Sequence, residues 1–530
     1  MDLTTIKKKL KPPSSNSDNA KHSDQLVYQL EGRPRLRIAV PLGLQHVLTM
    51  FAGNLAPVLI LAGVVSAATG DPIVSPEQKV RMVQLAMFVS GITTFIQLYP
   101  IKIGKFQIGA GLPIVMGTSS VFIGALMVIG AEFGLPVVFG TIIVGSLAEV
   151  CLGVFLKPLK RFLPPIVIGC VLLAIGLSLL PIGVMYFAGG AAAEVAAKKA
   201  AELTASGAVV PSDIAALAQQ YGSWQNIVTG SVVIAVIVLF QRFAKGIPKA
   251  LAILAGILAG YIASAVLGLV DFSRIGQASF ISLPIPTIFP EFQLGPILAI
   301  AALYLISGLE TMGNTNGITA AAFDREATPR EVSGAIVADA MGSMLAGWFN
   351  TLPNTAFGEN AGIVAMTKVV NKFAVATGSC ILVLASCFPM FGSIFSIMPS
   401  SVLGGAAITI FGMIITNGMK LIFIGGLSDR NVLIICLSFG IGFGISQSHQ
   451  LVAGFPAPLD FAFSQTTLTV SLVAILANIV FGKDVFTLTP FKRKPAKNTK
   501  DATALPDNNP QTDAQPLLSH STQEALKETL

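Results

Sequence analysis

The sequence predicts an all-α polytopic membrane protein, and three features carry this expectation. Only 12% of the 530 residues are charged, half of the roughly 25% found in soluble globular proteins. Apolar runs of roughly 20 residues, long enough to cross a bilayer as a helix, recur along almost the whole chain. The basic residues behind the net charge of +7 stand in short clusters between these runs and in both tails. That placement is typical of membrane orientation and argues against a nucleic-acid partner.

The apolar runs number about fourteen, and each is placed by its hydropathy. They cover residues 37–63, 80–99, 111–130, 135–156, 162–186, 224–242, 248–270, 293–313, 331–350, 353–370, 372–392, 395–417, 430–447 and 462–482. An even number of spans puts both termini on one side of the membrane. Loops after even-numbered spans carry most of the Lys and Arg, so that side is expected to be the cytoplasm. Loops after odd-numbered spans carry only Lys79, Arg81, Lys198, Lys199 and Arg274.

The expected division of the chain follows the span order. Residues 1–36 and 486–530 are polar and are expected to be disordered cytoplasmic tails, with the first resting on membrane lipid. No cleavable signal peptide is expected in the first of them, and the protein is expected in the plasma or inner membrane. Residues 188–222 form the one sizeable outside loop, whose Ala-rich, amphipathic pattern predicts a surface helix from Ala191 to Gln220. The membrane part comprises residues 37–187 (spans 1–5), 223–270 (spans 6–7), 292–392 (spans 8–11) and 393–485 (spans 12–14).

Two spans are interrupted at corresponding places. Fourteen spans divide into two halves of seven, and halves with an odd number of spans are repeats of inverted topology, in which span 3 corresponds to span 10. Gly111 to Ser120 opens span 3 and Leu352 to Asn360 opens span 10, each with a Pro, a short extended stretch and a Gly before a helix start. A helix that starts in mid-membrane directs free N–H groups at a polar ligand. The pair therefore predicts a transport site, with two ordinary Pro kinks as the alternative.

Acidic side chains stand beside these breaks. Glu310 follows a largely apolar run in span 8, where a carboxylate must face a partner or a pathway. It is a candidate substrate anchor that also carries a proton, unless span 8 ends before it. Asn314 lies on the same face if the helix continues. Glu359 follows Gly358 at the expected helix start in span 10, where it and Asn360 either bind substrate or only cap the helix.

Three further polar residues are expected inside the membrane. Asp339 in span 9 stands among apolar and small residues, and burial favours its protonated form. It is either a proton site or a structural hydrogen-bond partner of another helix. His46 in span 1 serves either packing or proton coupling. Glu149 in span 4 is equally open between a bond to another helix and a functional role.

Motifs of several other function classes are absent from the sequence. It has no GxxxxGK[ST], no HExxH and no GxSxG that opens a helix after a strand, so ATP-driven pumping and proteolysis lose support. No nucleophile, base and orienting group come together, so an enzyme is not expected. The five cysteines lie inside apolar runs without a CxxC pair or a neighbouring His, which predicts neither disulfides nor a metal site. Transport driven by an ion gradient remains, and no cofactor is expected.

The segment from Pro353 to Lys368 resembles the signature of the nucleobase–ascorbate transporter family, also called the nucleobase:cation symporter-2 family. That signature reads Gln/Glu/Pro-Asn-x-Gly-x4-Thr-Arg/Lys/Gly. Its fixed positions are satisfied by Glu359, Asn360, Gly362, Thr367 and Lys368. Other family patterns are matched by Gln45-His46, Gly308 to Thr311, Ala338-Asp339 and Leu112 to Ser119. The resemblance covers about residues 37–485.

The resemblance implies a fold of fourteen spans in two inverted repeats of seven, with short strands at the broken spans 3 and 10. A core domain would comprise spans 1–4 and 8–11, and a gate domain spans 5–7 and 12–14. The implied activity is symport of a nucleobase with a proton or sodium by an elevator-like motion, in a homodimer. The implied residues are the base-binding carboxylates Glu310 and Glu359, the neighbouring Gly358, Ser119 and Ser120, and the proton-coupling candidates Glu310, Asp339 and His46.

The chemistry of a nucleobase agrees with this assignment. A base edge offers N–H donors and C=O acceptors in one plane, so carboxylates accept from ring N–H groups while backbone N–H groups donate to the carbonyls. The flat ring also needs an apolar slot, which Phe122, Phe357 or Ile114 could supply. Ser120 stands where many relatives have Phe, which removes an aromatic wall.

The sequence favours an oxopurine, xanthine or uric acid, as the substrate. Asp339, Asn314 and the run from Leu112 to Gly117 resemble xanthine and urate permeases, whereas Glu359 in place of Gln resembles uracil permeases. A uracil permease of the same family is therefore the alternative. An anion exchanger or channel on the same fold is a further reading, against which the acid pair Glu310 and Glu359 argues because such proteins usually present a cationic or neutral site.

Overall fold

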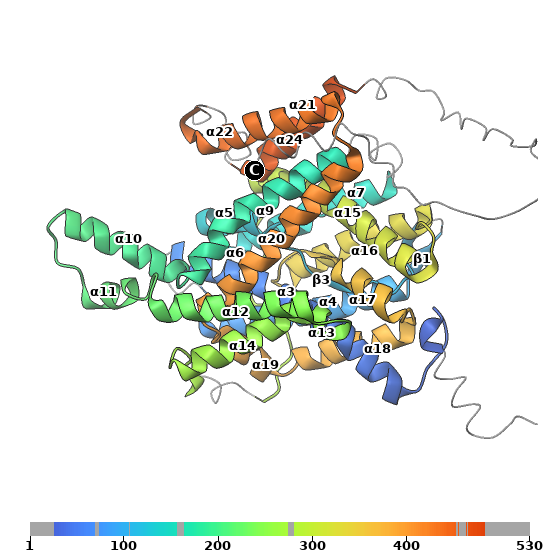
Figure 1. Cartoon of the computed structure of the whole chain (residues 1–530), viewed down its shortest axis with the longest axis horizontal. Helices are drawn as coiled ribbons and strands as arrows, with labels where there is room; N and C mark the ends of the chain where they lie inside the picture. The colour runs from blue at the N-terminus through green and yellow to red at the C-terminus, as the bar shows by residue number, and fades with distance from the viewer. Residues whose placement is uncertain are drawn as a thin grey trace, which may run out of the picture. The chain divides into compact units, whose positions relative to one another are not determined.

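Helices make up most of the chain in the computed structural model, which describes residues 26–68, 74–104, 106–155, 164–273, 280–451, 454, 463 and 465–482 (Figure 1). The only β-structure in these ranges consists of two short two-stranded sheets, β1 with β2 and β3 with β4. In chain order the elements are η1 (Leu26–Tyr28), α3 (Leu36–Ala68), α4 (Pro76–Leu98), β1 (Ile101–Ile103), β2 (Phe106–Ile108), β3 (Met116–Thr118), α5 (Ile123–Phe133), α6 (Leu135–Gly145), α7 (Leu147–Val154), α9 (Pro165–Phe187), α10 (Ala191–Ala205), α11 (Ser212–Ala218), α12 (Trp224–Phe243), α13 (Ile247–Ala250), α14 (Ala252–Val266), α15 (Leu294–Phe323), α16 (Pro329–Trp348), β4 (Asn354–Ala356), α17 (Glu359–Thr367), α18 (Lys372–Ser386), α19 (Pro389–Ser396), α20 (Ser400–Gly425), α21 (Asp429–Leu437), η4 (Ser438–Phe443), α22 (Gly444–Gln447), η5 (His449–Leu451) and α24 (Thr466–Val480).

Eight helical segments within the described ranges are long and apolar enough to cross a membrane, and nine if the bent pair α18 and α19 counts as one span. The shorter helices α5, α14 and α24 are apolar as well. The protein is therefore a multi-pass helical membrane protein, as the sequence predicts. Each of the fourteen predicted runs overlaps at least one helix of the structure. The helices in the predicted spans 331–350 and 353–370, α16 and α17, are not among those just counted.

Three predicted spans have different bounds in the structure. Helix α15 runs to Phe323, past the predicted end at residue 313. Thr315 and Thr319 donate their hydroxyls to carbonyls one turn earlier, which satisfies these polar side chains within the helix. The predicted span 372–392 is broken, with α18 and α19 meeting at 80° where Pro389 begins the second helix. Helix α20 begins after Pro399 and ends at Gly425, so it is displaced from the predicted 395–417.

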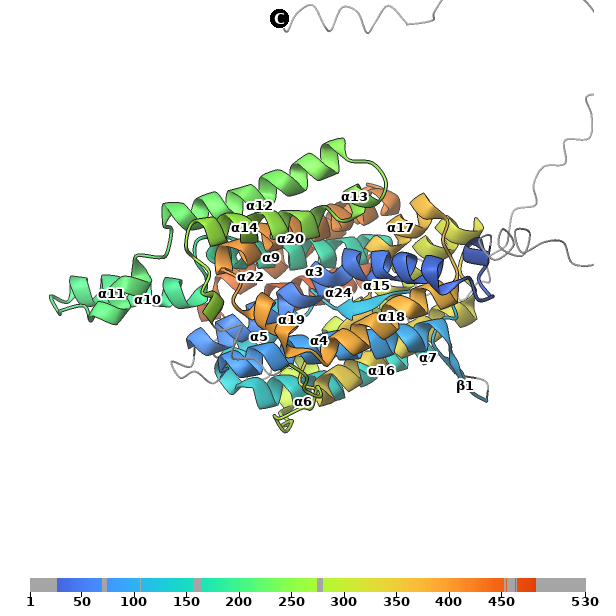
Figure 2. The same cartoon turned by 90° about the horizontal axis from the view of Figure 1, so that it is seen from below.

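The helices fall into two groups by their mutual contacts. The first helix group comprises α3 to α7 and α15 to α18, whose main contacts join α18 to α3 and α4, and α16 to α6, α7 and α15. The second helix group comprises α9, α12, α13, α14, α20, α21, η4 and α24, centred on the long contact between α9 and α20. Figure 2 shows α12, α14 and α20 along one side and α4, α6 and α16 along the other.

Small residues allow the close contact between α9 and α20. A Cβ atom on Gly176 would stand 2.5 Å from Ile415 Cγ1 and 2.9 Å from its backbone nitrogen. A Cβ atom on Gly418 would stand 2.6 Å from the backbone nitrogen of Leu173. Van der Waals packing at such short range is a main source of helix association in a membrane, where water no longer drives apolar surfaces together.

Part of the predicted N-terminal tail is ordered. The backbone amide of Val370 donates to the carbonyl of Val27, and that of Lys372 donates to Leu30, both at 3.1 Å. The Asn371 side chain donates to carbonyls of the same segment, including Leu26 at 3.1 Å. These contacts tie residues 26–32 to the start of α18. The remaining predicted tails, residues 1–25 and 486–530, lie outside the described residues.

The segment 188–222 differs from the single helix that the sequence predicts. It contains two helices, α10 and α11, which contact each other. Gly207, at a φ of +74°, and Pro211 stand between them. A left-handed backbone followed by a proline cannot continue a helix. Helix α10 also contacts α3 and α9, and buries Ala191, Ala193 and Ala196.

Candidate functional site

The two broken spans meet as an antiparallel pair of buried strands. Strand β3 pairs with β4 so that Gly117 stands opposite Thr355. Two more backbone bonds extend the pair, from Ser119 to the carbonyl of Pro353 at 2.8 Å and from Phe357 to Val115 at 2.9 Å. Each strand leads into a helix start, α5 after β3 and α17 after β4. The first amides of a helix have no acceptor one full turn earlier. Some of them already donate to nearby carbonyls, from Ile123 to Ser120, from Asn360 to Phe357 and from Ala361 to Gly358, so only the remaining amides of each start can serve a ligand.

Side chains that sequence reasoning missed hold this irregular backbone. Asn54 Oδ1 accepts from the Thr118 amide at 2.7 Å and from its hydroxyl at 2.9 Å. The Thr94 hydroxyl accepts from the Met116 amide at 2.9 Å, and the Ser343 hydroxyl bonds both backbone groups of Asn354 at 3.0 Å. Non-helical backbone survives at membrane depth only with such partners. Polar residues inside otherwise apolar spans are the signal that could have found them.

A cavity of about 280 Å³ lies where the two helix groups face each other. Its first wall comes from α3, the two strands, α15 and the start of α17, and its second wall from α9, α13, α14 and α20. Most of the predicted site residues line it, namely Ser119, Ser120, Glu310, Asn314, Phe357, Gly358 and Glu359. The second wall contributes Leu172, Ala250, Ile253, Ile410, Met413, Ile414 and Asn417.

Glu310 and Glu359 enter this cavity from different elements. Glu310 lies in the middle of α15, because that helix continues to Phe323, and one of its carboxylate oxygens is buried without a hydrogen-bond partner. Glu359 is the first residue of α17, with Gly358 as its N-cap, and its side chain is exposed to the cavity. A carboxylate at a helix N-terminus is favoured by the helix dipole. The two acids can therefore face one small ligand from two sides.

Asn314 and Gly358 form a close contact in the wall. The Asn314 amide nitrogen donates to the carbonyl of Ala356 at 2.7 Å, which fixes the end of β4. A Cβ atom on Gly358 would stand only 2.8 Å from Asn314 Oδ1. The backbone angles of Gly358 are ordinary, with φ −67° and ψ −30°. Glycine is required here by space and not by conformation.

Phe357 supplies the aromatic surface of the cavity. Its ring is bounded by two glycines, since a Cβ atom would come within 2.8 Å of the ring at Gly53 and 2.5 Å at Gly117. Phe122 and Ile114, the other expected candidates for the apolar slot, are fully buried and do not line the cavity. Phe122 packs instead on Tyr304, with ring centroids 4.5 Å apart. It cannot serve because the first residues of α5 turn it toward α15.

Three predicted site residues lie behind the cavity wall. Asn360 and His46 hydrogen-bond to each other, and the Asn360 amide also donates to the carbonyl of Pro113. They therefore tie α3, α17 and the break before β3 together. Asp339 is fully buried on α16 and accepts from the hydroxyl of Thr311. None of the three lines the cavity.

The ionisable side chains of the cavity are acids. Among the described residues that line it, Glu310 and Glu359 are ionisable, and none is Lys, Arg or His. Lys368, which ends α17, points elsewhere and donates to the carbonyl of Ala321 at 2.8 Å. The described ranges contain no cluster of three His, Cys, Asp or Glu that could hold a metal ion.

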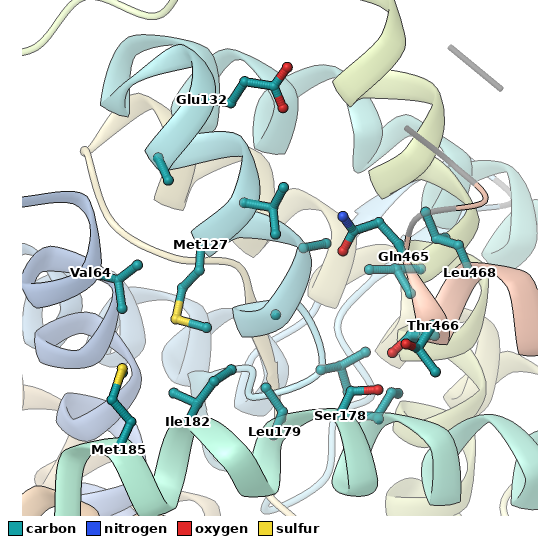
Figure 3. A pocket seen from close by; sticks show the side chains of 18 residues that line it. Val64, Met127, Glu132, Ser178, Leu179, Ile182, Met185, Gln465, Thr466 and Leu468 are labelled. Carbon is teal, nitrogen blue, oxygen red and sulfur yellow. The ribbon is translucent and has the colours of Figure 1, made fainter. Parts of the chain in front are cut away.

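A second cavity, of about 640 Å³, has a different character. Figure 3 shows Val64, Met127, Leu179, Ile182 and Met185 among the side chains that surround it. Its polar groups are few, and Glu132 and Gln465 are among them. A polar heterocycle needs convergent donors and acceptors. The smaller cavity supplies them and the larger one does not.

Comparisons with known proteins agree with this site. A family model described as a permease family (Xan_ur_permease) matches residues 37–218 and 209–451. Uric acid permease PucJ of Bacillus subtilis (strain 168) is 32% identical over 443 residues, which make up 83% of this chain and 92% of that protein. Xanthine permease XanQ of Escherichia coli (strain K12) is 29% identical over 477 residues, or 88% of this chain and 95% of that protein.

A solved structure supports the fold. The overall structure of SLC26A9 matches with a TM-score of 0.53 at 13% sequence identity, and the match covers 91% of this chain and 71% of that chain. At this identity the likeness concerns the fold alone. The family match over most of the chain shows more: the protein belongs to the nucleobase:cation symporter-2 family of permeases and is a membrane transporter, not an enzyme.

Proposed function

We propose that this protein takes up an oxopurine, xanthine or uric acid, by symport with a proton. The observation that carries the proposal is the meeting of Glu310, Glu359 and Asn314 in one cavity beside two helix starts. The names of the related uric acid and xanthine permeases support the substrate class. The carboxylates accept the ring N–H groups, while free amides at the starts of α5 and α17 donate to the ring carbonyls.

The dimensions of the cavity suit a small planar base. Its volume of about 280 Å³ lies just below the roughly 300–1,000 Å³ typical of small-molecule sites. The Phe357 ring offers a flat apolar surface, and the small side chain of Ser120 leaves room beside it. A fused two-ring base makes better use of that room than a pyrimidine, which favours a purine over uracil. An anion without ring N–H donors would meet two carboxylates and no cation, which disfavours an anion exchanger.

The proposed mechanism is alternating access between the two helix groups. The first helix group is the core domain, which carries substrate and proton, and the second is the gate domain, with the cavity between them. Elevator-like motion of the core against the gate would present the cavity to each side in turn. We further propose fourteen membrane crossings in two inverted repeats, with α5 and α17 as corresponding half-helices. Both termini would lie in the cytoplasm, and gate domains would join two copies into a homodimer.

The substrate proposal is tested by uptake of labelled xanthine into proteoliposomes. Glu310→Gln keeps the shape of the side chain but removes the charge and one acceptor, so we expect uptake to fall at least tenfold. The control is Glu326→Gln, an exposed acid just beyond the end of α15, which should transport normally. Competition by urate, uracil, guanine and hypoxanthine, with and without sodium, ranks the substrates and identifies the coupling ion. Full xanthine uptake by Glu310→Gln would contradict the assignment of the carboxylate.

A further inference from the structure

Two acidic side chains are buried together behind the cavity. Glu149 on α7 and Asp339 on α16 are both fully buried where α7 packs against α16, and their carboxyl groups interact with each other. Both oxygens of Glu149 and Oδ1 of Asp339 are buried and have no hydrogen-bond donor beside them. Among the described residues, no Lys, Arg or His forms an ion pair with Glu149 or Asp339. Gly308 provides the space, because a Cβ atom there would stand 3.2 Å from Glu149 Oε1.

Electrostatics decides the charge of this pair. Two neighbouring carboxylates that are both ionised in a low-dielectric site without a cation repel each other strongly, so such a pair has a high affinity for one shared proton. The other titratable groups that face the pair are Glu310 and Tyr304, both on α15. The Tyr304 hydroxyl bonds to the carbonyl of Ile142 at 3.3 Å, and Glu310 adds a further negative charge when ionised. Neither Glu310 nor Tyr304 carries a positive charge that could take the place of the proton.

Two hydroxyl groups connect the pair to the cavity. Thr355 on β4 lines the cavity, and its Oγ1 lies 3.4 Å from Asp339 Oδ2 and 3.4 Å from Thr311 Oγ1. Thr311 donates to the same Asp339 oxygen and directly follows Glu310 in the chain. A ligand that engages Glu310 or shifts β4 therefore changes both the charge and the hydrogen bonds around Asp339.

We propose that Glu149 and Asp339 together form the site of the coupling proton, with Glu149 as its previously unassigned member. The inference rests on the proposed proton symport and deepens it. One proton from water on the outer side adds to a carboxylate oxygen of the pair when substrate binds, and leaves to water on the inner side when substrate dissociates. No covalent bond to the substrate forms. Glu310 then acts on the proton through its charge, and Thr355 and Thr311 carry the hydrogen-bond connection.

The test uses the full-length protein in proteoliposomes loaded with a pH-sensitive dye. In Glu149→Gln the pair becomes a carboxylate and an amide, which carry a single negative charge without any proton, so the strong drive to take up the shared proton is lost. We expect exchange of labelled for unlabelled xanthine to stay within threefold of wild type, because exchange needs no net proton movement. Accumulation driven by a proton gradient should fall at least tenfold, and substrate-dependent proton entry should disappear. The control is Glu132→Gln, an exposed acid at the larger cavity (Figure 3), which should keep both.

The results separate this inference from the proposed function. If wild type moves xanthine without proton entry, the symport proposal fails. If wild type couples and Glu149→Gln couples equally well, only the inference fails. Should Glu149→Gln not fold, the infrared absorption of protonated carboxyl groups in wild type decides. Xanthine binding must shift a buried carboxyl band that is sensitive to deuterium exchange, and Asp339→Asn must remove that shift. A spectrum without any such band would overturn the inference.

Discussion

Replacing Gly358 by alanine tests the geometry of the cavity wall. The new Cβ atom would stand 2.8 Å from Asn314 Oδ1, where ordinary contact begins at 3.4 Å, so the Asn314 side chain must retreat by about 0.6 Å. Its bond to the carbonyl of Ala356, now 2.7 Å, would lengthen to about 3.3 Å, beyond the usual range of 2.7–3.2 Å. A weakened buried hydrogen bond of this kind is worth about 1–2 kcal/mol. Xanthine affinity should then fall roughly 5- to 30-fold.

The assay is equilibrium binding of labelled xanthine to purified protein. The matched control is Gly362→Ala on the same half-helix, where a Cβ atom meets nothing within 4 Å, so affinity should be unchanged. A double mutant tests the cause directly. Once Asn314→Ala has removed the obstructed side chain, adding Gly358→Ala should change affinity by less than about 0.5 kcal/mol. Wild-type affinity in Gly358→Ala, or additive losses in the double mutant, would refute the steric reasoning.

Three further substitutions test the framework around the site by thermal melting in detergent. Asn54→Ala removes the acceptor of three buried donors, so we expect the free energy of unfolding to fall by about 1–3 kcal/mol. Asn54→Asp keeps the acceptor and should have a smaller effect. Equal melting temperatures of Asn54→Ala and wild type would contradict the role of Asn54 in holding β3. Gly140→Ala would place a Cβ atom 1.8 Å from the carbonyl oxygen of Glu291, so it should destabilise by at least about 1–3 kcal/mol, and a normal melting curve would show that the loop moves freely. Lys372→Met breaks a 2.6 Å ion pair whose Glu31 partner is 74% exposed, so it should cost less than about 1 kcal/mol, and a larger loss would mean that residues 26–32 do more than cover the start of α18.

The site shows where prediction from sequence reaches and where it ends. Paired Pro and Gly breaks at 111–120 and 352–360 carry local information, since both residue types weaken a helix, and they locate the two helix starts. The sequence does not decide whether Glu310 lies at the interface or in the membrane interior, because the polar residues after it resemble a span end. In the structure α15 continues to Phe323 and Glu310 lies within it, while the polar side chains of Thr315 and Asn316 bond back to the helix.

Contacts between distant residues could not be read from the pattern. Asn360 belongs to the family signature, yet its side chain is turned to His46 and Pro113 and away from the cavity. The sequence leaves Glu149 open between a bond to another helix and a functional role, since nothing local indicates that it interacts with Asp339, 190 positions later. Asn54 was overlooked because its function depends on the β3 backbone that it holds.

By itself the amino-acid sequence determined that this chain is a membrane protein and roughly where its helices lie. It also determined where two spans are broken and which acids stand beside the breaks. These features depend on hydropathy, on proline and glycine, and on charged residues in apolar runs. Each acts over a few residues, so its effect can be predicted from the local sequence. Only the tertiary structure decided which polar groups meet: Glu310 with Glu359 across the cavity, His46 with Asn360, and Glu149 with Asp339. The physical reason is that a buried polar side chain takes its role from the one partner that packing places within about 3 Å, and packing joins helices far apart in the chain.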